Sequence, residues 1–212
     1  MSVILHAYQY SVYSWIARLV LHEKSVDHDY AEVDPFAVSI APDYLETHPF
    51  RRVPALIHDG FVLYETTAIT RYIDEAFPGV ALQSTGVRER ARQAQIVAVI
   101  DAYGYWPMVR QVFSHGYFRP RTGRPADPAE VATGLAASEV VLTALEALAG
   151  DGDCLVGDRV TLADLHLAPM MAYFTAADDG RAILERQPRL SAWWEGFRAR
   201  PSMSATEPRL PD

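Results

Sequence analysis

The feature of this sequence that most constrains its fold is a change of pattern near residue 80. Short β-favouring runs separated by turns fill the chain before Pro78, whereas long segments rich in Ala, Leu, Arg, Gln and Glu follow Val87. Segments of the second kind favour helix, and a change from mixed to purely helical pattern indicates two domains. We therefore predict an α/β domain over residues 1–80 and an all-helical domain over residues 87–212, joined by a linker over residues 81–86.

The first domain has the pattern of a thioredoxin-like fold. The Asp59-Gly60 pair between two apolar runs is a strong signal for a tight β-hairpin. Alternation and helical spacing predict the other elements. The expected elements are a strand over residues 3–5, a helix over 16–24, a strand over 28–34, a short helix over 43–46, a hairpin over 55–64 and a helix over 67–77. Their order is β-α-β-α-β-β-α.

The second domain is expected to contain helices only. Residues 87–113 have the pattern of one long helix, which Pro107 should kink. A loop over residues 120–125 precedes a helix over residues 128–148. Thr161 stands three residues before Asp164 and ahead of an apolar run, which is close to a capping box and predicts that another helix begins there.

Composition narrows the classes of partner. The formal net charge of −8 repels nucleic acid, so we expect no nucleic-acid partner. The single cysteine, Cys154, excludes an intrachain disulfide framework and a zinc site of several thiolates, and we expect no metal. No run looks apolar and long enough to span a bilayer, and the first residues do not resemble an export signal. We expect a cytoplasmic protein with no membrane partner that binds a small molecule.

The turn before the first helix is the first candidate site. Backbone N–H groups at a helix N-terminus stabilise an anion such as a thiolate. A Cys-x-x-Cys pair would lie here in a thioredoxin-like order, but this chain has Ser11-Val12-Tyr13-Ser14, so dithiol redox chemistry is disfavoured. A serine can instead donate a hydrogen bond to a thiolate that arrives with the substrate and lower the pKa of that thiol. The alternative is that Ser11 or Ser14 only caps the helix.

Two further segments suit the binding of a short peptide. A cis Val53-Pro54 bond at the entry to the third strand would turn the Val53 N–H and C=O toward a pocket, where they could clamp an extended peptide. The alternative is a proline that only ends the preceding loop. At the start of the next helix, backbone donors and the Thr66 hydroxyl suit a carboxylate, and Glu65 suits an α-amino group. The alternative is a capping Thr66 with a solvated Glu65.

These segments, in this order, resemble the cytosolic glutathione transferase family, and the resemblance covers nearly the whole chain. The matching segments are Ser11 with Arg18–Lys24 behind it, His48–Leu56, Leu63–Ile73 and Gly157–Asp164. We assign the chain to a bacterial-type, serine-dependent branch. Arg51 stands where the family commonly has glycine, and Thr66 replaces the usual serine but keeps the hydroxyl.

The resemblance implies a glutathione S-transferase that joins the glutathione thiolate to a small hydrophobic electrophile, with glutathione as co-substrate, no metal, and a homodimeric assembly. It implies that Ser11 hydrogen-bonds the glutathione sulfur. The predicted glutathione-binding residues are Tyr13, Ser14, Arg52, Val53, Pro54, Glu65 and Thr66. Within that set, Val53 would contact the cysteinyl unit, Glu65 and Thr66 the γ-glutamyl end, and Arg52 the glycine end. A tyrosine serves as the activating hydroxyl in some branches, so Tyr8, Tyr10 and Tyr13 remain alternatives to Ser11.

The acceptor substrate is expected where the two halves meet, a common place for small-molecule sites. The candidate residues are Tyr103, Trp106 and Tyr173, although aromatic residues at helical spacing are more often core. Alternative functions are a glutathione-dependent reductase or dehalogenase, and a non-catalytic binding or scaffolding module of the same fold. Isomerase-type members of the family carry Ser-Ser-Cys where this chain has Ser11-Val12-Tyr13, so we do not expect maleylacetoacetate isomerase activity.

Overall fold

The computed structural model describes residues 2–211, which form two compact units. The first unit holds the chain up to Ala81 together with Ala205–Pro208, and the second holds Leu82–Ser204 and the residues from Arg209 on. The first unit is therefore not one continuous stretch of chain. The sequence pattern gave no sign that residues 205–208 return to it.

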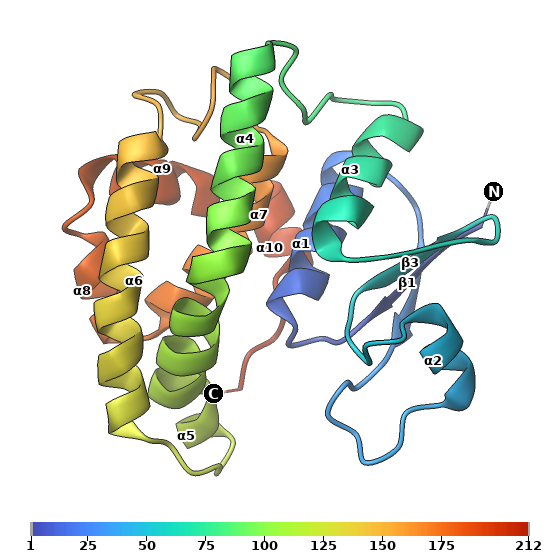
Figure 1. The fold of residues 1–212 in the computed structure, drawn as a ribbon, viewed down its shortest axis with the longest axis horizontal. Helices are drawn as coiled ribbons and strands as arrows, with labels where there is room; N and C mark the ends of the chain where they lie inside the picture. Colours follow the sequence, from blue (N-terminus) through green and yellow to red (C-terminus); the bar gives the residue numbers. More distant parts are fainter. Residues whose placement is uncertain (1, 212) are drawn as a thin grey trace. The chain divides into compact units, whose positions relative to one another are not determined.

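The first unit has the expected thioredoxin-like order of elements. They are β1 (Val3–Ala7), α1 (Val12–Glu23), β2 (Asp29–Glu32), α2 (Pro42–Thr47), β3 (Ala55–His58), β4 (Phe61–Tyr64) and α3 (Thr66–Ala76). Helices α1 and α3 pack together on one side of the sheet, and α2 lies on the other (Figure 1). The expected order β-α-β-α-β-β-α is confirmed.

Strand order explains how distant parts of this unit come together. The sheet has the order β2-β1-β3-β4, in which β1 is parallel to β2 and antiparallel to β3, and β3 is antiparallel to β4. His6 near the end of β1 pairs with Ala55 at the start of β3, and Ala55 pairs with Tyr64 at the end of β4. The segments that follow β1, precede β3 and follow β4 therefore lie at one edge of the sheet.

Local chemistry accounts for the strands. Burial alternates along β1, whose Val3, Leu5 and Ala7 side chains face the core, as expected for a strand with one buried face. The turn between β3 and β4 places Asp59 at φ 47° and Gly60 at φ 85°. Positive φ at both central residues is what a tight hairpin turn requires, and an Asp-Gly pair supplies it at little cost. The predicted hairpin is confirmed.

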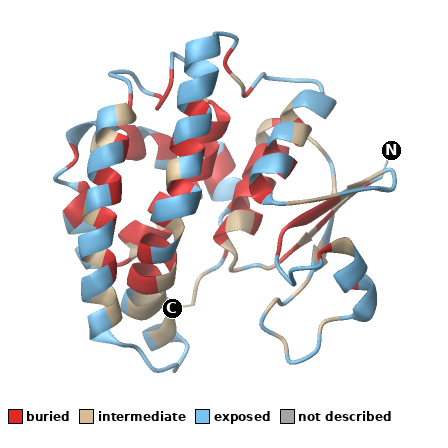
Figure 2. Cartoon of the chain, in the orientation of Figure 1, coloured by how far each residue is buried: buried red, intermediate tan, exposed pale blue. Residues whose placement is uncertain are grey.

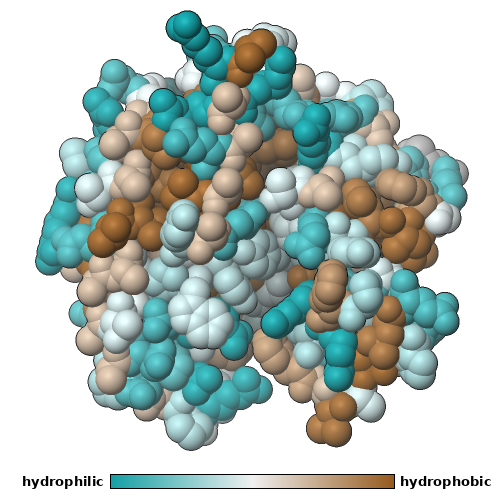
Figure 3. Space-filling view, in the orientation of Figure 1, coloured by the Kyte–Doolittle hydropathy of each residue, from teal (hydrophilic) through white to brown (hydrophobic). Residues whose placement is uncertain are grey.

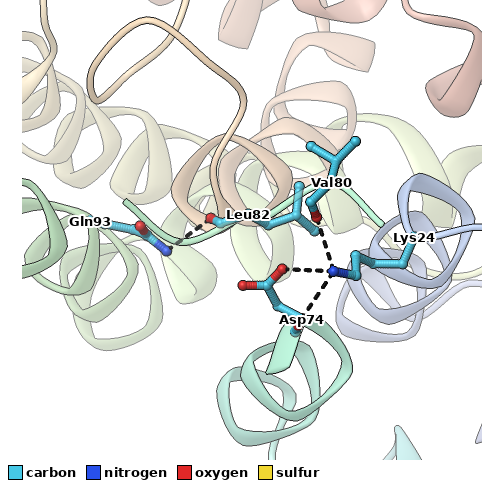
Figure 4. A network of polar contacts seen from close by, with 5 residues as sticks. All are labelled: Lys24, Asp74, Val80, Leu82 and Gln93. Carbon is cyan, nitrogen blue, oxygen red and sulfur yellow. Dashed lines mark hydrogen bonds and ion pairs between the residues drawn. The ribbon is translucent and has the colours of Figure 1, made fainter. Parts of the chain in front are cut away.

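A buried ion pair ties the end of α1 to the end of α3 (Figure 4). The Lys24 ammonium donates to the Asp74 carboxylate at 3.2 Å, to the Asp74 carbonyl at 3.1 Å and to the Val80 carbonyl at 2.9 Å. Both side chains are at most 5% exposed. A buried charge is tolerated when its donors are satisfied, and here all three ammonium hydrogens have an acceptor. The lysine therefore fixes the C-terminal ends of α1 and α3 to each other.

The second unit is helical. Its elements are α4 (Val87–Val99), η1 (Ile100–Gly104), η2 (Trp106–Phe118), α5 (Arg119–Arg121), α6 (Pro128–Leu148), α7 (Leu162–Ala176), α8 (Asp178–Leu184) and α9 (Pro188–Arg198), and α10 (Pro201–Thr206) begins in it. Segments η1 and η2 are π-helical. The expected single helix with a kink at Pro107 is thus replaced by an α-helix that continues as π-helix. Proline lacks the backbone N–H that would donate a hydrogen bond within the helix. The change from α-helix to π-helix begins at Ile100, seven residues before Pro107, so Pro107 alone does not cause it.

The predicted capping box is present at the N-terminus of α7. The Thr161 N–H donates to the Asp164 carboxylate at 2.8 Å, and the Ala163 N–H donates to the Thr161 hydroxyl at 3.3 Å. The Trp193 indole N–H donates to the other carboxylate oxygen of Asp164 at 2.9 Å. Burial raises the pKa of Asp164, while the hydrogen bonds that its carboxylate accepts act in the opposite direction. Asp164 therefore both caps α7 and joins it to α9.

Helix α6 contacts η2, α8 and α9, and most of its residues are exposed or half-buried (Figure 2). Its buried residues are Gly134, Ser138, Val141, Leu142 and Leu145. Alanine, valine and leucine dominate this helix. Contrary to our expectation, α6 is long and apolar enough to cross a membrane by length and composition, the one such helix among residues 2–211. Core helices of soluble proteins, which are mostly buried, meet the same criterion, whereas 28% of the apolar stretch of α6 is buried.

Candidate functional site

Strand register brings the three predicted glutathione segments to one edge of the N-terminal sheet. Ser11 follows β1, Val53 precedes β3, and Glu65 follows β4. The pairings His6–Ala55 and Ala55–Tyr64 place these three points side by side. Helices α1 and α3 both begin at this edge, so the N–H groups of two helix N-termini are directed to it. The edge is suited to an anionic peptide.

Ser11 caps helix α1 and keeps a hydrogen to donate. Its hydroxyl oxygen accepts from the Ser14 N–H at 3.2 Å, as the capping alternative predicts. A hydroxyl has one donor and two acceptor positions, so capping uses an acceptor and leaves the O–H hydrogen available. The side chain is half-buried at the start of the helix. Capping and the donation of a hydrogen bond to a bound sulfur are therefore compatible.

The neighbouring hydroxyls differ in access. Ser14 is fully buried, and its oxygen accepts from the Tyr8 N–H at 3.2 Å. It has no surface with which to contact a ligand, so its position supports a structural role and not the glutathione contact expected for it. Tyr8, Tyr10 and Tyr13 are half-buried, and the rings of Tyr8 and Tyr10 are 5.6 Å apart. These tyrosines remain close enough in sequence and space to be alternatives to Ser11.

The loop before β3 has unusual backbone geometry. The Val53–Pro54 peptide is cis, and both residues are buried. Arg51 has φ 54°, in the left-handed region that favours glycine. Arginine therefore occupies a position whose backbone suits the glycine that is common in the family. Arg52 is exposed, so its guanidinium is free to reach a ligand at the sheet edge.

The start of α3 is also strained. Glu65 has φ 70° and is exposed, and Thr66 at the first position of the helix is 7% exposed. With ψ 117°, Glu65 lies outside the left-handed helical region, and a non-glycine residue held in such a conformation costs about 1–3 kcal/mol; residues of this kind cluster at active sites and ligand-binding segments. The Glu65 side chain accepts no capping hydrogen bond from the helix. Strain at Glu65 and the helix N-terminus together support a ligand-binding role for this segment.

Sequence reasoning gave no role to two buried side chains beneath this edge, Tyr44 and His48. Tyr44 donates to the Arg52 carbonyl, and the His48 ring lies 4.9 Å from the ring of Tyr64. Burial lowers the pKa of His48, while the charge of Glu65 raises it and that of Arg52 lowers it. The His48 ring therefore packs on Tyr64, the residue before Glu65. In the sequence, the aromatic residues around positions 44–50 were the feature that could have indicated packing beneath the site.

The protein's own thiol is not suited to nucleophilic chemistry. Cys154 is 7% exposed, and burial raises the pKa of its thiol to about 11. A thiolate at neutral pH must therefore come from a ligand. Over residues 2–211, no group of three or more His, Cys, Asp or Glu side chains is arranged to hold a metal ion.

The predicted acceptor residues of the helical unit fall into two classes. Tyr103 is 67% exposed and Trp106 is 61% exposed. Tyr173 is 1% exposed, and its ring stacks on Phe113 at 4.1 Å, so it lies in the core of this unit. The burial of Tyr173 argues against a direct contact with a substrate. On the face drawn in Figure 3, hydrophobic residues form several separate patches.

Comparison with known proteins identifies the family. Residues 5–81 match the family model for the N-terminal domain of glutathione S-transferase, and residues 105–201 match the model for its C-terminal domain. Glutathione S-transferase F13 of Arabidopsis thaliana is 33% identical over 196 residues, which cover 91% of this chain and 89% of that protein. The chain belongs to the glutathione S-transferase family.

Two other similarities agree with this assignment. The structure of glutathione S-transferase III in its apo form superposes with a TM-score of 0.87 at 28% identity and covers 100% of this chain and 99% of its own. A probable maleylacetoacetate isomerase of Caenorhabditis elegans is 31% identical over 170 residues, 79% of this chain and 77% of the relative.

Family membership confirms the expected fold class and the expected enzyme class. The protein is a glutathione transferase, of the kind that joins glutathione to electrophilic substrates. Named plant relatives support the family as a whole. They do not distinguish the bacterial-type, serine-dependent branch that the sequence led us to expect.

Proposed function

We propose that this transferase binds glutathione along the shared edge of its N-terminal sheet and that the Ser11 hydroxyl stabilises the glutathione thiolate. The observation that carries the proposal is the strand register, which gathers Ser11, Val53 and Glu65 from distant parts of the sequence. Ser11 keeps a free donor hydrogen at the start of α1. The serine-dependent branch is proposed on the same ground.

The other residues at the edge bind the peptide. Val53 contacts the cysteinyl unit through its backbone, beside Pro54. Glu65 accepts from the α-amino group, and Thr66 with the N-terminus of α3 donates to the γ-glutamyl carboxylate. Arg52 pairs with the carboxylate at the glycine end, and Tyr13 lies beside the sulfur. Exposure of Arg52 and Glu65 supports these roles.

The chemistry follows from these contacts. Donation from Ser11 and the dipole of α1 favour the charged form of the thiol, so its pKa falls and its proton leaves to solvent. The thiolate then attacks the electrophilic carbon, a sulfur–carbon bond forms, and the leaving group departs with the electron pair. Tyr103 and Trp106 are the proposed contacts for the acceptor. We also propose a homodimer in the cytoplasm, which the resemblance favours.

Titration of bound glutathione tests the role of Ser11. In Ser11→Ala, the pKa of the bound thiol should rise by about one unit or more, equivalent to about 1.4 kcal/mol per unit. The thiolate is followed by its ultraviolet absorbance across a pH series. Ser11→Thr is the matched control because it keeps a hydroxyl that can also cap α1. An unchanged titration in Ser11→Ala, with a shift in Tyr8→Phe, Tyr10→Phe or Tyr13→Phe, would transfer the role to that tyrosine.

A second set of assays separates the alternative functions. Retention on immobilised glutathione followed by conjugation of an activated aryl halide supports the transferase. Absence of retention contradicts the proposal, whereas retention with only disulfide exchange favours a reductase, and retention without any turnover favours a binding module. The isomerase-named relative makes maleylacetoacetate a useful additional substrate, for which the Ser11-Val12-Tyr13 turn predicts no turnover.

A further inference from the structure

Helix α2 contacts the loop that carries Val53. The Tyr44 hydroxyl donates to the Arg52 carbonyl at 2.6 Å, and Tyr44 is 5% exposed. Burial raises the pKa of this hydroxyl to about 12, so it keeps its proton at neutral pH. A buried hydrogen bond of this length, with a tyrosine as a permanent donor, fixes the position of the acceptor.

The held carbonyl belongs to the same peptide group as the Val53 N–H. A peptide group is planar, and in a trans peptide such as Arg52–Val53 the C=O and N–H point in opposite directions. Fixing the Arg52 oxygen toward Tyr44 therefore fixes the direction of the Val53 N–H away from Tyr44. That N–H is one of the two backbone groups proposed to meet the cysteinyl unit of glutathione.

The Tyr44 ring is itself held in place. It packs in a buried cluster with Val53 and Ala55, so it contacts both the loop and the first residue of β3. The ring of His6 on β1 lies 5.4 Å from the Tyr44 ring, and the ring of His48 lies 6.5 Å away. Packing on three sides leaves the hydroxyl few other directions, so the donor is oriented before any ligand binds.

His48, at the end of α2, contacts both the loop that carries Val53 and the residue before Glu65. Its N–H donates to the Tyr44 carbonyl at 2.8 Å, and its carbonyl accepts from the Arg51 N–H at 3.0 Å. Its ring lies 4.9 Å from Tyr64, the residue before Glu65. The end of α2 thus contacts both the peptide-binding loop and the start of α3.

We infer that Tyr44 is a positioning residue for the glutathione site, which holds the Arg52–Val53 peptide so that the Val53 N–H faces the cysteinyl unit. The inference rests on the proposed function, because it assigns Tyr44 to the same site. Tyr44 does not touch the reacting atoms. Its removal should therefore weaken the binding of glutathione and leave the chemical step unchanged.

The test compares Tyr44→Phe with Tyr72→Phe in the full-length protein. The control removes a tyrosine hydrogen bond in the same unit, since the Tyr72 hydroxyl lies 2.8 Å from the His58 ring nitrogen at the far end of β3. Tyr44→Phe should lower the affinity for glutathione about fivefold, the effect of one ordinary hydrogen bond. At saturating glutathione, kcat should stay within about twofold of wild type in both variants.

Hydrogen–deuterium exchange of the free protein provides a readout that does not depend on glutathione. Exchange over residues 51–56 should be faster in Tyr44→Phe and unchanged in Tyr72→Phe. Wild-type affinity in Tyr44→Phe, or an equal loss in Tyr72→Phe, would overturn the inference. If wild type binds no glutathione, the proposed function fails and the inference with it, whereas faster exchange alone would still show that Tyr44 holds this loop.

Discussion

Two buried side chains near the sheet edge hold backbone groups, whereas Arg52 and Glu65 at the same edge are exposed. Ser14 accepts from the Tyr8 N–H, and Tyr44 donates to the Arg52 carbonyl, both from buried positions. A peptide ligand that extends along the edge would then meet backbone groups together with the Ser11 hydroxyl and the exposed Arg52 and Glu65. Because backbone groups cannot be removed by substitution, variants of the supporting side chains are the practical way to test the edge.

A buried histidine makes the stability of the N-terminal unit depend on pH. His48 is 2% exposed, and burial lowers its pKa from the ordinary value of 6.5. Below pH 6.5 the unfolded chain binds a proton at this residue before the folded chain does. The folded state therefore loses stability as the pH falls from 6.5 to the lowered pKa, and keeps it in full above 6.5.

His48→Phe should flatten this dependence, because it keeps a ring beside Tyr64 and removes the titrating group. The measurement is the free energy of unfolding from urea titrations at about pH 7.5 and about pH 5.5, where one histidine contributes at most about 1.4 kcal/mol per pH unit. His22→Phe, a change at a histidine on the last turn of α1, serves for comparison. Equal slopes for wild type and His48→Phe would show that His48 does not titrate differently on folding.

At the scale of elements, pattern and turn chemistry were enough to predict the N-terminal unit. The Asp59-Gly60 signal and the alternation along the strands are local, and the element order followed from them. The π-helical segments were not predictable in this way, because the residues from Ile100 on have ordinary helical spacing. Nor was the role of Tyr44, since its partner lies eight residues away and depends on the path of a loop.

Close packing of α6 on η2 depends on a glycine. A Cβ added at Gly134 would lie 2.7 Å from the Gln111 Cβ and 3.0 Å from the Pro107 carbonyl oxygen. Alanine improves helix propensity by about 1 kcal/mol, but overpacking against backbone costs about 1–3 kcal/mol. Because a backbone oxygen cannot move aside alone, we expect the overpacking to outweigh the gain in propensity, so that Gly134→Ala lowers the free energy of unfolding by up to about 2 kcal/mol.

The matched control is Gly196→Ala in α9, where an added Cβ meets no atom within 4 Å. Here only helix propensity changes, so stability should rise by up to about 1 kcal/mol. Denaturant unfolding of the two variants gives the comparison. Stabilisation by both substitutions would mean that η2 and α6 are not in close contact at Gly134.

At the scale of the whole molecule, the two units do not correspond to two consecutive stretches of the chain, contrary to what the two sequence patterns suggest. We predicted a boundary over residues 81–86, and contacts group Ala205–Pro208 with the first unit. The Trp15 indole N–H donates to the Thr206 hydroxyl at 2.9 Å, and both side chains are buried. A contact across 191 positions leaves no periodic signal in the sequence, because only one pair of residues carries it.

Thr206→Val should destabilise the first unit, because it keeps the shape of the side chain and removes the acceptor of the Trp15 indole. Leaving a buried donor without its acceptor costs about 1–3 kcal/mol, which denaturant unfolding followed by far-ultraviolet circular dichroism can detect. Thr206→Ser, which keeps the hydroxyl, should lie close to wild type. If Thr206→Val is as stable as Thr206→Ser, the indole contact contributes nothing to stability.

The return of residues 205–208 to the first unit also has a consequence for biosynthesis. A ribosome makes the strands and helices of that unit first, but this short segment emerges only after residues 82–204 have been translated. The first unit therefore gains the contact between the Trp15 indole and the Thr206 hydroxyl only after residues 82–204 have been made. Messages truncated ahead of this segment would yield polypeptides whose earliest-made unit is still missing a piece.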